Sequence, residues 1–125
     1  MDNQSMRNWS SMRGLKVMVE GEGRVIGTVE DFYAHSQTNE VYSFHVHTRL
    51  LGDFALPARM ISAIEQDVVT IASEEKLERE FPPFPRGQAL VGCKVFSESG
   101  TEIGTVRDVL LGITDLAPLW WSAQR

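Results

Sequence analysis

Only one cysteine, Cys93, occurs among the 125 residues of the chain. A single thiol cannot form an intramolecular disulfide, so the sequence gives no sign of an oxidising compartment. Long apolar stretches are also lacking. No segment approaches the roughly 20 apolar residues that a membrane-spanning helix needs, and residues 1–13 are too polar for a signal peptide. We therefore expect a cytoplasmic protein that does not insert into a membrane.

Positive charge is scarce as well. The chain has 12 Lys and Arg residues against 17 Asp and Glu residues, which gives a formal net charge of −5. Nucleic-acid affinity comes largely from neutralisation of phosphates by Lys and Arg, so DNA and RNA are disfavoured as main partners. The basic residues near the N-terminus are Arg7, Arg13, Lys16 and Arg24. We interpret residues 1–13 as a polar, solvated tail in which Trp9 either docks on the barrel or stays mobile.

One short pattern occurs twice in the chain. Residues 23–31 and 100–108 are identical at six of nine positions, and Gly-Leu-Lys-Val at 14–17 matches Gly-Cys-Lys-Val at 92–95. Each copy is typical of a β-hairpin, in which two strands flank a glycine-containing turn with positive φ. We interpret residues 14–73 as one unit, 74–87 as a connector and 88–125 as a shortened second repeat. Since about 60 residues bury only about 60% of their unfolded surface, we expect the halves to support each other.

The second strand of each hairpin carries an Ile three residues before a Val. These pairs are Ile26 with Val29, and Ile103 with Val106. Strict alternation along a strand sends residues three apart to opposite faces. A bulge or bend at Gly27 and Gly104 would bring each pair to one face, and such bends are typical of small barrels.

The remaining pattern predicts an all-β fold. Strands are expected at 41–48, 53–56, 68–72 and 116–123, with a helical turn within 57–67, a short helix at 74–80 and an extended proline-rich segment at 81–85. The result is a small barrel of about five strands, a three-stranded partial second repeat and one short connecting helix.

The repeated pattern resembles the PRC-barrel family. In the first copy the motif residues are Gly14, Gly23, Ile26, Gly27, Val29 and Asp31; in the second they are Gly92, Gly100, Ile103, Gly104, Val106 and Asp108. The resemblance covers residues 14–72 well and only 92 to about 123 of the second copy. It implies a β-barrel used as an assembly or adaptor module, as in the H subunit of photosynthetic reaction centres and in ribosome maturation factors. The resemblance does not name a partner.

Few residues are candidates for catalysis or for binding a metal or a nucleotide. No glycine-rich phosphate loop is followed by Lys-Ser or Lys-Thr. His45 and His47 share one face of a strand and are the metal candidates, with His35 as a third ligand if the strand ends meet. Cys93 matches Leu15 in the first copy, so we expect it to be a small buried side chain. No enzyme activity and no cofactor are expected.

Two aspartates occupy the same place in both copies. Asp31 and Asp108 each follow the repeated Gly-Thr-Val. Acid catalysis is one interpretation of these carboxylates, and hydrogen bonding to local backbone amides is the simpler one.

The strongest functional signal is the sequence Leu119-Trp120-Trp121. On a strand the two indoles point to opposite faces, so at least one needs a surface outside its own small core. That surface belongs either to the first copy or to another chain. We predict a non-catalytic protein-binding and assembly module, a homodimer formed through the second repeat, with a further protein partner unidentified. One alternative is a small-ligand or metal-binding sensor that uses the His45/His47 face. Another is an adaptor in RNA metabolism or on the ribosome.

Overall fold

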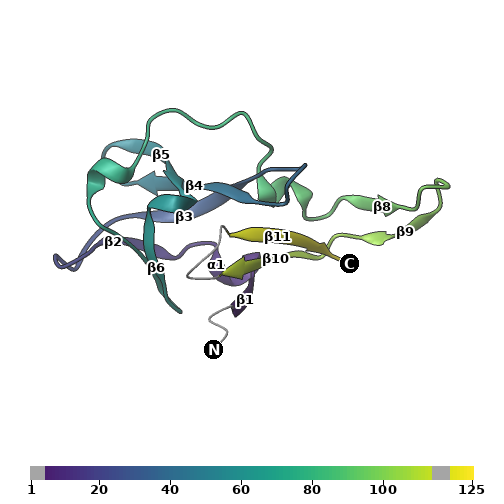
Figure 1. Ribbon diagram of the computed structural model, residues 1–125, viewed down its shortest axis with the longest axis horizontal. Coiled ribbons are helices and arrows are strands. Elements are labelled where there is room, and N and C mark those ends of the chain that lie inside the picture. The colour runs from purple at the N-terminus through teal and green to yellow at the C-terminus, as the bar shows by residue number, and fades with distance from the viewer. Residues whose placement is uncertain (1–4, 114–118) are drawn as a thin grey trace.

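The computed structural model describes residues 5–113 and 119–125 and consists mainly of β-strands, as predicted (Figure 1). The strands are β1 (Ser5–Asn8), β2 (Lys16–Val19), β3 (Arg24–Ala34), β4 (Val41–Thr48), β5 (Gly52–Pro57), β6 (Ile61–Ile64), β7 (Val68–Ile71), β8 (Lys94–Phe96), β9 (Glu102–Thr105), β10 (Asp108–Ile113) and β11 (Trp120–Gln124). The helical elements are α1 (Trp9–Met12) and the 3-10 turns η1 (Ala58–Met60), η2 (Glu74–Lys76) and η3 (Gly87–Leu90).

The strands form three sheets. The largest is a curled sheet in the order β5-β4-β3-β2-β7-β6, in which β7 runs parallel to β2 and the other neighbours are antiparallel. A second sheet has the order β1-β10-β11, and the third is the hairpin of β8 and β9. The curl of the large sheet makes a half-barrel, which confirms the small all-β, barrel-like fold.

Both hairpins contain the expected bulge. The register of β2 against β3 shifts between Val17 and Met18, and the register of β8 against β9 shifts between Val95 and Phe96. A side chain at Gly27 would place its Cβ 2.6 Å from the carbonyl oxygen of His47. Only glycine therefore lets β3 and β4 approach so closely at this bend.

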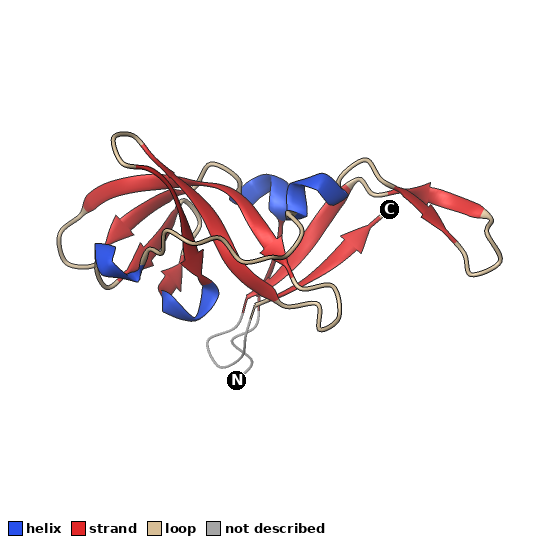
Figure 2. Ribbon diagram, turned by 90° about the horizontal axis from the view of Figure 1, so that it is seen from above, coloured by secondary structure: helices blue, strands red, loops and turns tan. Residues whose placement is uncertain are grey.

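One hydrophobic core unites the first half of the chain (residues 5–73) with the second half (residues 88–125). Buried residues of the first half, among them Val17, Phe44 and Leu56, belong to the same cluster as Val109 and Leu111 of β10. The second half therefore contributes β10 to a shared interior, while its hairpin β8–β9 extends away from the body of the molecule (Figures 1 and 2).

The structure differs from the expected solvated tail over residues 5–12. The strand β1 pairs with β10, and α1 buries Trp9 and Met12. These two side chains are three residues apart, so one helical turn places both on the core side. The Trp9 ring packs edge-on against Phe32 at 5.0 Å, and its Nε1 donates to Oε1 of Gln88 at 2.5 Å.

The connector (residues 74–87) also differs from the prediction. The expected helix over 74–80 is reduced to η2, because Glu78 exchanges two backbone hydrogen bonds with Ala55 at the edge of β5. The helical turn expected within 57–67 is limited to η1, and residues 61–64 form β6. Of the strand predicted at 116–123, residues 116–118 lie outside the described residues. Within the described ranges, no helix has the length and apolar character needed to cross a membrane.

Candidate functional site

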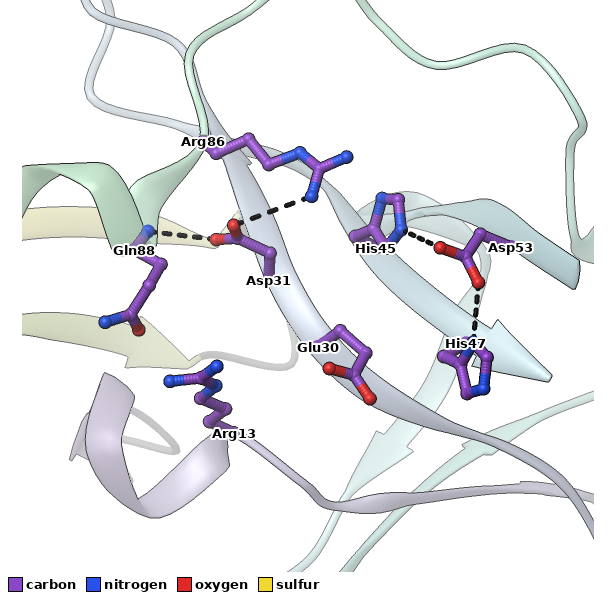
Figure 3. A pocket seen from close by; sticks show the side chains of 8 residues that line it. All are labelled: Arg13, Glu30, Asp31, His45, His47, Asp53, Arg86 and Gln88. Atoms are coloured by element: carbon purple, nitrogen blue, oxygen red, sulfur yellow. Dashed lines mark hydrogen bonds and ion pairs between the residues drawn. The ribbon is translucent and has the colours of Figure 1, made fainter. Parts of the chain in front are cut away.

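The two histidines of β4 lie on one face of the strand, as predicted, and both contact Asp53 of β5. Nε2 of His45 lies 2.8 Å from Oδ2 of Asp53, and Nδ1 of His47 lies 2.7 Å from Oδ1 (Figure 3). The antiparallel register places Asp53 directly opposite His47. Sequence reasoning missed Asp53, although a tight hairpin over residues 49–52 would have predicted this pair.

The environments of the two imidazoles are unlike. His45 is only 4% exposed, whereas His47 is exposed. The ring of Phe81 stacks on His45 with centroids 4.9 Å apart. The connector thus covers His45, while His47 on the same face of β4 stays open to solvent.

A buried tyrosine completes this cluster. The hydroxyl of Tyr33 lies 2.8 Å from Nδ1 of His45, and Tyr33 is 3% exposed. Nε2 of His45 donates to Asp53, since an ionised carboxylate can only accept, and the hydroxyl of Tyr33 can donate to Nδ1. Burial raises the pKa of the Tyr33 hydroxyl, so this group stays protonated at neutral pH.

The carboxylate of Asp53 is held in its charged form. Hydrogen bonds from His45, and next from His47, lower the pKa of Asp53 below its ordinary value. The carboxylate is therefore ionised throughout the neutral pH range.

His45, His47 and Asp53 form one wall of a polar pocket of about 370 Å³. Its lining comprises Arg13, Glu30, Asp31, His45, His47, Asp53, Arg86 and Gln88 (Figure 3). Arg86 from the connector lies 3.9 Å from Asp31 and 5.6 Å above the ring of Tyr33. The pocket therefore lies where the half-barrel, the connector and the second half meet.

The histidine face offers poor geometry for a metal ion. Within residues 5–113 and 119–125, no three His, Cys, Asp or Glu side chains are arranged to hold one. His45 and His47 direct a nitrogen to different oxygens of Asp53. His35, the possible third ligand, instead packs its ring against Phe84 at 4.7 Å.

The paired aspartates bind backbone amides, the simpler of the two interpretations. Oδ1 of Asp31 accepts from its neighbour Phe32 at 2.8 Å and from the backbone of Gln88 at 2.9 Å. Asp108 accepts from the backbone of Val109 at 2.7 Å and from Ser10. The bonds to the next residue could be predicted from sequence, but no local pattern indicates the long-range bonds between the halves.

The expectation that Cys93 is buried is wrong. Its side chain is exposed, with Sγ 3.2 Å from the carbonyl oxygen of Ala89. Leu15, its match in the first half, is buried in the core. The difference arises because the hairpin of β8 and β9 leaves the body of the molecule, whereas the hairpin of β2 and β3 belongs to the large sheet.

The two indoles of β11 are used within the chain. Nε1 of Trp121 donates to the carbonyl oxygen of His35 at 3.3 Å, and the Trp121 ring packs against the core. The Trp120 ring occupies the space that a side chain at Gly112 would need. Leu119 is buried. The structure thus places Trp121 against the first half, and both indoles remain only partly buried.

The hairpin of β8 and β9 presents an open edge. In the first half, β2 lies between β3 and β7, whereas the sheet containing β8 has only β9 as a partner among the described residues. Phe96 and Ile103 on this hairpin are 55% and 46% exposed. Unpaired edges with apolar side chains are typical association sites.

The first half of the chain is similar to a known protein family. A family model described as a PRC-barrel domain matches residues 5–77. No curated protein matches the chain.

Proposed function

The chain belongs to the PRC-barrel family, and we propose that it is a non-catalytic protein-binding and assembly module that self-associates through its second half. The observation that carries this proposal is the edge of β8, which has no partner strand within residues 5–113 and 119–125, although the matching edge of β2 is covered by β7. A hairpin with an unpaired strand edge is suited to pairing with a strand of another chain.

We propose that the second half repeats the opening hairpin of the PRC-barrel unit. Matched backbone bonds support it: the amide of Gly14 donates to Val29 at 2.7 Å, and the amide of Gly92 donates to Val106 at 2.8 Å. A helical turn also precedes the hairpin in each half, as α1 and η3. Among the described residues, β8 has no partner on the side that β7 covers in the first half.

The hydrogen bonds of Tyr33, Asp31 and Asp53 support a binding role over catalysis. Tyr33 is buried and hydrogen bonded, and Asp31 is engaged with backbone amides. Asp53 is shared by two imidazoles. These three side chains thus each have a hydrogen-bond partner inside the protein, which favours a structural role for them over turnover.

Light scattering and analytical ultracentrifugation at several concentrations test the proposal. We expect a mass that rises from monomer toward dimer with concentration. The double variant Phe96→Ser/Ile103→Ser should stay monomeric, while Val25→Ser, which changes a 48% exposed side chain in the first half, should behave as the parent protein. A parent protein that remains monomeric at high micromolar concentration would contradict self-association.

The tryptophan segment is the second part of the proposed interface. Leu119 is buried, but Trp120 and Trp121 keep part of their surface open. Trp120→Ser should therefore weaken the dimer without abolishing it, provided that circular dichroism shows the fold intact.

A second candidate function is small-ligand sensing at the polar pocket. The pocket of about 370 Å³ supports it, because the free nitrogen of exposed His47 and the guanidinium of Arg13 face an open space. Thermal-shift measurements with divalent metals and small anions test this function. Stabilisation that disappears in His45→Ala/His47→Ala would favour a sensor, and the absence of any shift would leave protein binding as the function.

A further inference from the structure

The backbone of β8 shows which groups are available at its open edge. The carbonyl of Cys93 accepts from Val106, and the amide of Ser97 donates to Thr101, both at 2.8 Å. These two residues therefore turn their polar groups toward β9. Alternate residues of a strand direct N–H and C=O to opposite sides, so Lys94 and Phe96 direct theirs to the open edge.

The first half shows how the same edge is covered when a third strand is present. Lys16 and Met18, which match Lys94 and Phe96, lie beside Val68 and Thr70 of β7. The amide of Glu20 continues this contact by donating to Ile71 at 2.8 Å. Among the strands that the structure describes, the edge of β8 is thus the same backbone surface without a covering strand.

Resting on the proposed self-association, we propose that β8 pairs antiparallel with β8 of a second copy about a two-fold axis through Val95. A two-fold axis perpendicular to the sheet makes an edge complementary to itself only in the antiparallel sense. The two hairpins then form one continuous sheet. Lys94 and Phe96 of one copy exchange hydrogen bonds with Phe96 and Lys94 of the other.

The side chains fit this register. Lys94 faces Phe96 of the second copy, so the aliphatic stem and the ammonium group of the lysine lie against an aromatic ring that is 55% exposed in the single chain. No like charges stand opposite each other. The ion pair of Lys94 with Glu102, at 3.5 Å, lies on the exposed face of the hairpin and does not block the edge. A second copy therefore suits the edge by both shape and charge.

The length of β8 sets the strength of the contact. Three residues per strand bury little surface, so the pairing belongs to the weak end of specific interfaces. We expect a dimer whose population depends on concentration in the micromolar range or above.

Disulfide trapping tests the register. In a Cys93→Ser background, Val95→Cys places two thiols across the two-fold axis at a non-hydrogen-bonded pair, where Cβ atoms lie about 4.5–5.5 Å apart. Mild oxidation should convert most of this variant to a covalent dimer. Val25→Cys, in the same background, is the matched control and should stay monomeric. A disulfide formed by Phe96→Cys and not by Val95→Cys would overturn the register.

A backbone variant tests the edge itself. Phe96→Pro removes the outward amide, while Cys93 and Ser97 keep their bonds to the opposite side of the hairpin. By symmetry each dimer loses two hydrogen bonds, so the dissociation constant should rise about tenfold or more. Phe96→Leu retains the amide and should change it far less. If the parent dimerises, Val95→Cys does not cross-link and Phe96→Pro dimerises unchanged, edge pairing is wrong but self-association stands. A parent that is monomeric at every concentration overturns both.

Discussion

Asp31 of β3 accepts a hydrogen bond from the backbone amide of Gln88 at 2.9 Å, so a carboxylate of the first half holds the start of η3 in the second half. In the matching contact, the second half supplies the carboxylate and the first half supplies the donors. Asp108 of β10 accepts from the backbone of Ser10 at 3.3 Å and from its hydroxyl at 2.6 Å, at the start of α1. In each half, an aspartate in the same sequence context thus accepts hydrogen bonds from a helical turn of the other half.

Removal of the Asp31 carboxylate should loosen the junction between the halves. Asp31 is 7% exposed, and Asp31→Ala leaves the amides of Phe32 and Gln88 without an acceptor. We expect a loss of about 1–3 kcal/mol in the free energy of unfolding, measured by urea denaturation. Asp31→Asn retains one oxygen and should lose less. Glu30→Ala, at the exposed neighbouring position, should change stability by no more than about 0.5 kcal/mol. Equal losses in Glu30→Ala and Asp31→Ala would argue against this role.

The pairing of Asp53 with two histidines should appear in the pH dependence of stability. The pKa of Asp53 is lower in the folded protein than in the unfolded chain, so the folded state favours the charged carboxylate. This contribution is complete above the ordinary aspartate pKa and is lost as pH falls through the lowered folded value. Urea midpoints measured from about pH 5 down to about pH 2 should therefore fall less steeply in Asp53→Asn than in the parent protein. Glu30→Gln should keep the parent slope, and a parent slope in Asp53→Asn would refute the prediction.

The bend at Gly27 should not tolerate a side chain. A Cβ there would lie 2.6 Å from the carbonyl oxygen of His47 and 2.8 Å from Cγ1 of Val46. Gly27→Ala must therefore push β3 away from β4, at a cost of about 1–3 kcal/mol of unfolding free energy. Ser62→Ala on exposed β6 is the control for a small change on a strand. A thermal midpoint in Gly27→Ala as high as that of the control would show that the strands separate easily.

Cys93 should react as an exposed thiol. Its side chain is exposed and directly precedes β8. We expect a thiol reagent to modify the native protein completely, at a rate close to that of the urea-unfolded chain, at concentrations where the protein is monomeric. Strong protection in the native state would show that this part of the hairpin is covered.

The family and the hairpins could be predicted from sequence because their signals are local. Turn glycines, the spacing of Ile26 and Val29, and the alternation over residues 41–48 depend only on near neighbours. The structure has the two bulges in the predicted hairpins and β4 at the predicted residues. The amide bonds of Asp31 and Asp108 to their next residues are local in the same way.

The burial of individual side chains was decided by segments far apart in the chain. Trp9 is buried because residues 5–8 pair with β10, and His45 is buried because Phe81 of the connector lies on it. Cys93 is exposed although its sequence context matches that of buried Leu15, since in the described part of the chain the first hairpin has a third strand beside it and the second has none. Sequence by itself determined the two glycine-containing hairpins and the curled β architecture. The tertiary structure alone decided which faces are covered, because burial depends on long-range pairing that no local pattern encodes.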